Sequence, residues 1–254
     1  MPHLDPHKVT GVVVVGAGHG IGLGLAKGSL ERFPRAKVAA TYRNADKASP
    51  LKDFEQAASR LQTYQLDPLS PKQLEGFAKE LARQSEGIQV CVNAVGMLHE
   101  GERGPEKSLR DIDSDWLTKV FQVNAVVTPL LAKAFFPLLR GQHPTLFAAV
   151  SAKVGSISDN GMGGWYGYRA SKAALNMFLK NISLELPRRG CHTLVAAIHP
   201  GTTVTELSQP FIQNTKYQLH SPEETGTHIW QVLLGLDFEQ QGKFWSWDGQ
   251  ELPW

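Results

Sequence analysis

Tyr168 and Lys172 are the residues whose types and spacing point most directly to chemistry in this sequence. They lie in a segment whose apolar residues continue to Leu186 with helical spacing. Residues four apart share one face of a helix, so the phenol and the ammonium can reach the same bound ligand. A cation about 4 Å from the phenol, at an effective dielectric near 20, is worth roughly 4 kcal/mol, or about three pKa units. The pKa of the phenol would then approach neutrality, where the hydroxyl can pass a proton to a carbonyl oxygen.

The spacing alone also fits an ordinary surface pair on a helix. Tyr166 has Ala170 four residues later and therefore lacks such a cation. Of the five tyrosines, only Tyr168 has a lysine at this spacing. The interpretation therefore depends on the elements that would position the pair.

A glycine-rich loop at residues 16–22 follows a predicted buried strand at 11–16 and leads into a helical pattern at 23–33. This order of strand, loop and helix is the context that a dinucleotide-binding motif requires. The loop must turn tightly, let its backbone approach a pyrophosphate, and point a helix N-terminus at the anion. The predicted contacts are Gly16, Gly18, His19, Gly20, Ile21 and Gly22.

The residue after the second predicted strand, 37–42, bears on the choice of cofactor. Enzymes that bind NAD usually place an acid about 20 residues beyond the glycines, on the ribose 2′-hydroxyl. Here that place is taken by Tyr42 and Arg43, and the nearest acid, Asp46, comes later. Guanidinium forms bidentate, charge-assisted bonds with a phosphate. A solvated loop arginine is the alternative, but the sequence favours NADP over NAD, with Arg43 on the 2′-phosphate.

Further strands are predicted at 61–67, 88–93, 145–151, 191–199 and 242–247, and helices within 47–60 and at 70–85, 114–139, 166–187 and 222–236. Ligands of a parallel sheet bind beyond the carboxyl ends of its strands. Residues 206–221 look irregular, and the segment 202–221 is predicted to form a mobile substrate flap within a single domain, 1–254. Cofactor contacts are also expected at the strand ends: Asp67 (which could instead cap a helix), Asn93, Gly96, Pro200, Gly201 and Thr203.

Asn124 lies among apolar residues of the predicted helix 114–139. A buried amide must be satisfied by hydrogen bonds. It is either a core amide bonded to a neighbouring element or a residue that holds water in a proton relay.

Composition indicates an ordinary globular protein, with 42% hydrophobic and 20% charged residues. A net charge of +2 gives no nucleic-acid footprint. Cys91 and Cys191 lie in apolar runs and are predicted to be buried, reduced thiols rather than a disulfide or metal ligands. The polar N-terminal residues and the apparently strand-sized apolar stretches predict a cytoplasmic protein without a membrane span.

Taken together, the sequence resembles the short-chain dehydrogenase/reductase family over nearly its whole length. The motifs that carry the resemblance are residues 16–22, 93–96, Asn124, 168–172 and 200–201, and residues 156–160, 163–166 and 247–254 further resemble its C-factor-like branch. The resemblance implies a Rossmann-type, doubly wound parallel β-sheet of about seven strands flanked by helices. It also implies a nicotinamide cofactor and hydride exchange with a small-molecule carbonyl or alcohol. In the family the residue matching Tyr168 is the acid/base, that matching Lys172 binds the nicotinamide ribose and lowers the phenol pKa, and that matching Asn124 anchors a relay water.

The sequence departs from the family pattern at Val15, Ala94 and Ala152. Ala152 matters most, because the substrate-orienting serine usually occupies that place. We expect Ser156 to substitute, since Gly155 would free the local backbone, and place Ser151 second because strand alternation points it to the other face.

The leading hypothesis is an NADP(H)-dependent carbonyl reductase or alcohol dehydrogenase. The alternative is a nucleotide-binding signalling or regulatory protein with little turnover, which Ala152 and the C-factor resemblance motivate. Residues 97–105, 155–165 and 203–221 are expected to wall the substrate pocket. By the family's habit, helices 114–139 and 166–187 would form a homodimer or homotetramer.

Overall fold

The chain folds around one eight-stranded sheet with the strand order β10-β9-β6-β5-β4-β1-β2-β3. The computed structural model describes residues 3–84, 87–213 and 215–254. Seven strands are parallel and only β10, at one edge, is antiparallel to its neighbour. The bounds are β1 (Gly11–Val15), β2 (Lys37–Tyr42), β3 (Leu61–Gln65), β4 (Val90–Asn93), β5 (Gly141–Val150), β6 (Cys191–His199), β9 (Lys243–Ser246) and β10 (Glu251–Leu252).

Strand β1 lies at the centre of this sheet because its sequence can be buried on both faces. Val12, Val13, Val14 and Val15 are all fully buried, as expected of a β-branched run in a parallel sheet. The chain leaves β1 for β2 on one side, while β4 pairs on its other side. The order of the strands therefore reverses between β1 and β4, where doubly wound sheets bind their ligands.

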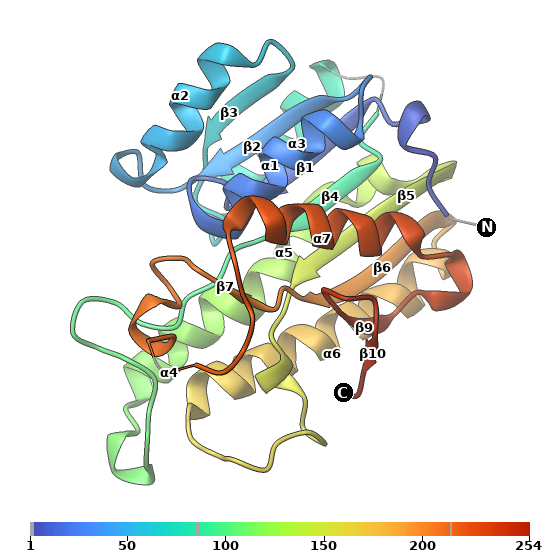
Figure 1. Cartoon of the computed structure of the whole chain (residues 1–254). Coiled ribbons are helices and arrows are strands. Elements are labelled where there is room, and N and C mark those ends of the chain that lie inside the picture. The colour runs from blue at the N-terminus through green and yellow to red at the C-terminus, as the bar shows by residue number, and fades with distance from the viewer. Residues whose placement is uncertain (1–2, 85–86, 214) are drawn as a thin grey trace.

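Helices cover both faces of the sheet (Figure 1). One buried apolar cluster includes residues of α1 (Gly20–Arg32), α2 (Ser49–Ala57) and α7 (Pro222–Gly235). The cluster on the opposite face includes residues of α3 (Pro71–Gln84), α5 (Val127–Leu139) and α6 (Tyr166–Arg188). Short 3₁₀ turns are η1 (Pro6–Lys8), η2 (Asp46–Ala48), η3 (Leu109–Asp111), η5 (Lys153–Gly155), η6 (Gln209–Phe211) and η7 (Phe238–Gln240).

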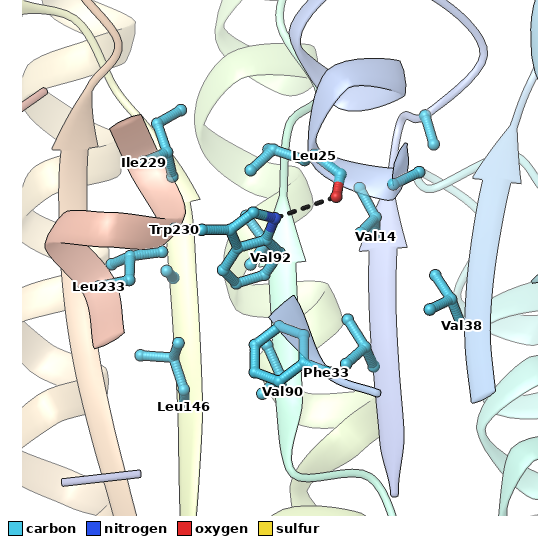
Figure 2. Packing of buried hydrophobic residues seen from close by; sticks show 14 of the residues in the cluster. Val14, Leu25, Phe33, Val38, Val90, Val92, Leu146, Ile229, Trp230 and Leu233 are labelled. Carbon is cyan, nitrogen blue, oxygen red and sulfur yellow. Dashed lines mark hydrogen bonds between the residues drawn. The ribbon is translucent and has the colours of Figure 1, made fainter. Parts of the chain in front are cut away.

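Helices α1 and α7 pack side by side because both carry glycine at their contact (Figure 1). A Cβ on Gly24 would overlap the carbonyl oxygen of Pro222, and a Cβ on Gly226 would lie 2.6 Å from the carbonyl carbon of Gly24. Trp230 fills the core below this contact, and its indole nitrogen donates a 3.0 Å hydrogen bond to the carbonyl of Leu25 (Figure 2). This contact fixes the position of α1, whose first residues, from Gly20, belong to the glycine loop.

The predicted helix 114–139 is continuous but has three parts, α4 (Ser114–Phe121), the π-helical segment η4 (Gln122–Val126) and α5. The expectation that apolar stretches are only strand-sized was wrong, because these 26 residues are long and apolar enough to cross a membrane. Of their most apolar stretch, 56% is buried inside the protein. Because α5 packs on the sheet and on α3, this helix has the environment of a core helix.

The strands and helices lie where the sequence predicts them, apart from local differences. The short strand β10 was missed, and β5 begins four residues earlier than predicted, with an irregular register between Gly141 and Thr145. Residue 85, predicted to end α3, lies outside the described residues. Cys91 and Cys191 are free and buried.

The segment 202–221 is more regular than predicted. Its base is a two-stranded parallel pair of β7 (Thr202–Thr203) and β8 (Leu219–His220), and η6 lies between them. Residue 214 lies outside the described residues. We call this segment the flap.

Candidate active site

A cleft of about 850 Å³ opens at the carboxyl ends of the parallel strands. It is lined by the glycine loop and by residues that follow β2, β4, β5 and β6. Residues 97–101, 159–165 and the flap also line it, so each of the three segments predicted as walls contributes.

The glycine loop is shaped for a close approach. Gly16 and Gly20 have φ angles of +82° and +56°, a region that favours glycine. A Cβ on Gly22 would overlap the carbonyl oxygen of Gly16, so the turn leaves no space for a side chain. Helix α1 begins at Gly20, and its N-cap residue His19 makes no side-chain capping hydrogen bond. The first N–H groups of α1 are thus without a side-chain cap at the cleft, as a helix that receives a phosphate requires.

Arg43 lines the cleft just after β2 and is exposed. No ion pair found among the described residues involves its guanidinium. Asp67 also lines the cleft, but its carboxylate accepts a 3.0 Å hydrogen bond from the Leu69 N–H. Its carboxylate therefore caps a turn, while the hydroxyl of Ser70 accepts from Gln73 at the start of α3.

Tyr168 and Lys172 share one face of α6 and both line the cleft. The Lys172 side chain is almost fully buried, and its Nζ donates a 3.0 Å hydrogen bond to the carbonyl of Val150 at the end of β5. Its Nζ lies 5.8 Å from the centroid of the Tyr168 ring. Tyr166, by contrast, lies outside the cleft lining and is exposed.

The predicted lowering of the phenol pKa was wrong for this arrangement. Burial raises the pKa of Tyr168 to about 12, and burial lowers the pKa of Lys172 to about 8. Desolvation disfavours the charged form of each group. The ammonium lies over the phenol ring and binds the Val150 carbonyl, which is a different geometry from the close ammonium–hydroxyl pair assumed in the sequence argument. At neutral pH the phenol is therefore protonated.

Asn124 is fully buried in the π-helical segment, and its amide joins two walls of the cleft. Its Oδ1 accepts from the Met97 N–H at 2.7 Å, and its Nδ2 donates to the Met97 carbonyl at 2.8 Å. The same Nδ2 donates to Ser171 at 3.0 Å, whose hydroxyl donates to the Tyr168 carbonyl. The side chain therefore links the loop after β4 to the backbone of α6 at Tyr168, as the core-amide interpretation expects. π-turns inside α-helices are frequent at functional sites.

The hydroxyls of both candidate serines are engaged in hydrogen bonds, and of the two residues Ser151 lines the cleft whereas Ser156 does not. Ser156 is buried outside the cleft lining, and its hydroxyl accepts from the Asp159 N–H at 3.2 Å. Ser151 donates to Asn176 of α6 at 2.6 Å, on the face that strand alternation predicts. The place of the family's serine is thus left to Ala152, which does line the cleft.

The reasoning that connected Gly155 with Ser156 was also wrong. Gly155 is absent from the residues with positive φ in the described chain, so it does not serve as a flexible turn. A Cβ on Gly155 would lie 2.7 Å from the Cβ of Lys172. Glycine is required here because η5 packs against α6 at the position of Lys172.

The remaining predicted contacts divide into two groups. Gly96, Pro200, Gly201 and Thr203 line the cleft, whereas Asn93 lies behind it. Asn93 accepts from the Val95 N–H and donates to Thr128, so it holds the loop after β4. The Thr203 hydroxyl is bonded to that of Thr225 at 2.8 Å, which ties the base of the flap to α7.

Several cleft residues were not singled out by the sequence analysis. Lys47, beyond Arg43, pairs with Glu206 of the flap at 2.6 Å. Trp165, the residue before α6, and Phe211 of η6 lie ring to ring with centroids 5.1 Å apart. Helical or strand spacing cannot predict contacts between residues so far apart in sequence. The sequence did show the basic residues within 43–47 and the aromatic residues of the predicted walls.

Comparison with known proteins agrees with this geometry. The family model described as short chain dehydrogenase matches residues 10–216. The chain belongs to the short-chain dehydrogenase/reductase family. It is therefore an oxidoreductase of the NAD(P)-dependent class that this family name denotes, and the glycine loop, the uncapped α1 N-terminus and Arg43 fit a dinucleotide.

Individual proteins are similar to this chain over 65–98% of its length. The C-signal protein of Myxococcus xanthus is 32% identical over 167 residues, which span 65% of this chain and 96% of that protein. The NADPH-bound carbonyl reductase from chicken fatty liver has the same fold, with a TM-score of 0.86 at 24% identity over 98% of this chain and 95% of its own. The carbonyl reductase Sniffer of D. melanogaster superposes with a TM-score of 0.84 at 26% identity over 98% of this chain and 100% of its own.

Proposed function

We propose that this short-chain dehydrogenase/reductase reduces small carbonyl compounds with NADPH, and that Tyr168 is its proton donor. The observation that carries the proposal is the joint position of Tyr168 and Lys172 on the face of α6 that lines the same cleft as the glycine loop. The similarity in sequence and structure to Sniffer, a carbonyl reductase, supports the class of reaction.

Tyr168 suits the reductive direction. Reduction of a carbonyl consumes a proton, and a phenol with a pKa of about 12 holds its proton at neutral pH. The reverse reaction needs the phenolate, which burial disfavours. A nicotinamide bound beside Tyr168 would supply the hydride.

Lys172 and Asn124 support the donor in different ways. With a pKa of about 8, Lys172 is mainly an ammonium at neutral pH, and its positive charge stabilises the phenolate that proton donation leaves behind. Asn124 holds the backbone at Tyr168 through Ser171 and holds the cleft wall at Met97. These residues keep the donor in place while the flap side of the cleft receives the substrate.

The preference for NADP over NAD rests on Arg43, since the ammonium of its neighbour Lys47 is paired with Glu206. Arg43 and Lys47 both line the cleft after β2, where the 2′-substituent of an adenosine ribose lies in this fold. Arg43 has no ion pair among the described residues, so its guanidinium is available for a phosphate. A hydrogen bond to a charged group is worth about 1.5–3 kcal/mol, or roughly 10- to 100-fold in affinity.

A fluorescence titration with NADPH and NADH, followed by a panel of carbonyl substrates, tests the proposal. We expect tighter binding of NADPH, and Arg43→Ala should weaken NADPH binding about 10- to 100-fold with little effect on NADH. Arg35→Ala is the matched control, because Arg35 is exposed in the turn before β2 and lies outside the cleft lining. Tighter binding of NADH would refute the role of Arg43.

A nucleotide-binding regulatory protein is the second candidate, because Ala152 stands where the family usually has its serine and the hydroxyls of Ser151 and Ser156 are bonded to other groups. The sequence similarity to C-signal is compatible with it. Where such donors have been removed, the loss is about 2.7–4 kcal/mol of transition-state stabilisation. Tight NADPH binding without NADPH oxidation across the carbonyl panel would favour this alternative. Homo-oligomerisation through 114–139 and 166–187, and a cytoplasmic location, stay predictions from the sequence.

A further inference from the structure

Three aromatic rings from three separate segments meet beside Tyr168. Trp165 precedes α6, Phe211 lies in the flap, and His99 follows β4. The Trp165 and Phe211 centroids are 5.1 Å apart with an interplanar angle of 64°, and those of His99 and Phe211 are 6.0 Å apart. Trp165 also meets the Tyr168 ring edge to face at 6.1 Å and 77°. We call Trp165, Phe211 and His99 the aromatic wall.

Trp165 is held in an unusual backbone conformation. It is the only non-glycine residue with positive φ in the described chain, at +50°. Gly163 and Gly164 precede it at +67° and +65°, so three successive residues are left-handed. A bulky residue in this region is strained and persists only where its surroundings hold it, often at a binding site.

The strained turn is fixed from outside the cleft. The Trp165 N–H donates to the carbonyl of Glu106 at 2.5 Å, and the Glu106 carboxylate accepts from the Gly167 N–H at 3.0 Å. Glu106 is almost fully buried. The loop after β4 therefore locks the backbone on both sides of Tyr166, and this places the indole between the proton donor and the flap.

The polar atom of His99 in the aromatic wall also has a partner. His99 Nε2 lies 3.1 Å from the carbonyl oxygen of Glu206, so its polar atom faces the flap backbone. Met97, Leu98 and Ile212 are apolar residues that line the same cleft. The nearby charges Lys153 and Asp159 lie 3.7 Å apart and are paired with each other. Trp165 therefore presents an aromatic surface beside the Tyr168 ring.

From this geometry we infer that the aromatic wall makes the enzyme selective for carbonyl groups attached to an aromatic ring. The inference deepens the proposed function and rests on it. A planar ring whose carbonyl reaches Tyr168 meets the indole and the flap ring, and aromatic pairs in edge-to-face or offset contact are worth about 3- to 10-fold in affinity beyond the area that they bury. A saturated ring of the same size gains the burial without the aromatic contact.

The test compares acetophenone with cyclohexyl methyl ketone, which have the same carbon skeleton and differ in ring saturation. The quantity measured is the ratio of their kcat/KM values with NADPH. Intrinsic differences in reactivity cancel when this ratio is compared between the native enzyme and its variants. We expect Trp165→Leu and Phe211→Leu each to lower the ratio by about 3- to 10-fold.

Leucine at position 165 keeps a side chain in the left-handed region, so the backbone strain is matched while the ring is lost. Trp165→Gly removes both the ring and the strain, and we expect the same loss of selectivity with an unchanged or higher Tm. Tyr166→Leu is the control, since this neighbouring aromatic residue lies outside the cleft lining and should leave the ratio unchanged. A ratio that is the same in the native enzyme, Trp165→Leu and Phe211→Leu would overturn the inference, even if turnover is high.

Failure of the proposed function gives a different result. If no carbonyl compound is turned over, binding of 1-phenylethanol and 1-cyclohexylethanol to the NADP⁺-saturated protein is measured by calorimetry. Tighter binding of the phenyl compound that is lost in Trp165→Leu supports the wall in a protein without turnover. Equal binding of the two alcohols, or a preference that Trp165→Leu leaves intact, contradicts the inference.

Discussion

Replacing Gly155 with alanine should displace helix α6 without changing the identity of Tyr168 or Lys172. The new Cβ would lie 2.7 Å from the Cβ of Lys172, 2.9 Å from its carbonyl carbon and 3.2 Å from the Ala173 nitrogen. Two of these three atoms belong to the backbone of α6, so no side-chain rotation can relieve the contact. Ordinary contact begins at 3.4 Å, and the difference of 3.4 − 2.7 requires η5 and α6 to separate by about 0.7 Å.

That displacement acts on the position of Lys172 and, one turn away, on Tyr168. A misplacement of about 1 Å can cost on the order of 10²-fold in rate. We therefore expect Gly155→Ala to lower kcat by about 10- to 100-fold at saturating NADPH and substrate. Overpacking should also reduce the free energy of unfolding by about 1–3 kcal/mol, which lowers Tm by several degrees.

The assay is steady-state NADPH oxidation at 25 °C, with circular dichroism as a check that the variant is folded at that temperature. Gly104→Ala is the control, because a Cβ there meets no atom within 4 Å and the residue lies outside the cleft lining. If Gly155→Ala keeps kcat within twofold of the native value, the close packing of η5 on α6 does not set the position of the pair.

Four further predictions concern stability. Gly24→Ala should destabilise the protein by at least about 2 kcal/mol, because its Cβ would overlap the Pro222 carbonyl. Gly76→Ala on α3, where a Cβ meets no atom, should instead raise the free energy of unfolding by about 0.5–1 kcal/mol. Urea midpoints of the two variants equal to that of the native protein would contradict these two predictions. Burial and the charge of Lys153 lower the pKa of His199 to about 4, so the unfolded chain binds more protons between pH 6.5 and 4. The free energy of unfolding should fall by up to roughly 3 kcal/mol on acidification through this range, and a His199→Asn variant that shows the same fall would refute the assignment. Asn124→Leu strands the N–H and carbonyl of Met97, and we expect a loss of about 2–6 kcal/mol in urea unfolding; a loss below 1 kcal/mol would mean that the amide is dispensable.

The sequence was sufficient to predict the elements whose residues carry a local signal. The valine run of β1 can only be satisfied in a sheet covered on both faces, and the glycine loop that follows has one common structural context. These two features predicted a parallel sheet with its ligand beyond the carboxyl ends of the strands, and the resemblance to the short-chain dehydrogenase/reductase family implied the doubly wound fold. The position of Tyr168 and Lys172 on one face of α6 followed from helical spacing alone.

What could not be predicted depends on contacts between segments far apart in the chain. The ammonium of Lys172 binds the Val150 carbonyl, which places it over the Tyr168 ring and not beside its hydroxyl. Spacing along a helix fixes a shared face but neither the depth of burial nor the partner on the next strand. Burial then raised a pKa that the isolated pair was expected to lower.

The role of Gly155 shows the same limit. From the sequence, a glycine in a loop suggests a flexible backbone. In the structure, Gly155 instead allows η5 to pack closely against α6. The left-handed conformation of Trp165 also has no local signal beyond the two glycines that precede it. It becomes understandable only with Glu106 and the flap in place.

The most direct test of the central claim is the turnover of Tyr168→Phe at saturating NADPH with a carbonyl compound that the native enzyme reduces. The account predicts a fall in kcat of at least about 10²-fold, with NADPH affinity within a few fold of native, and a comparable fall for Lys172→Met. Tyr166→Phe, two residues earlier and outside the cleft lining, should retain native turnover. A Tyr168→Phe enzyme with native kcat would contradict the assignment of Tyr168 as the proton donor.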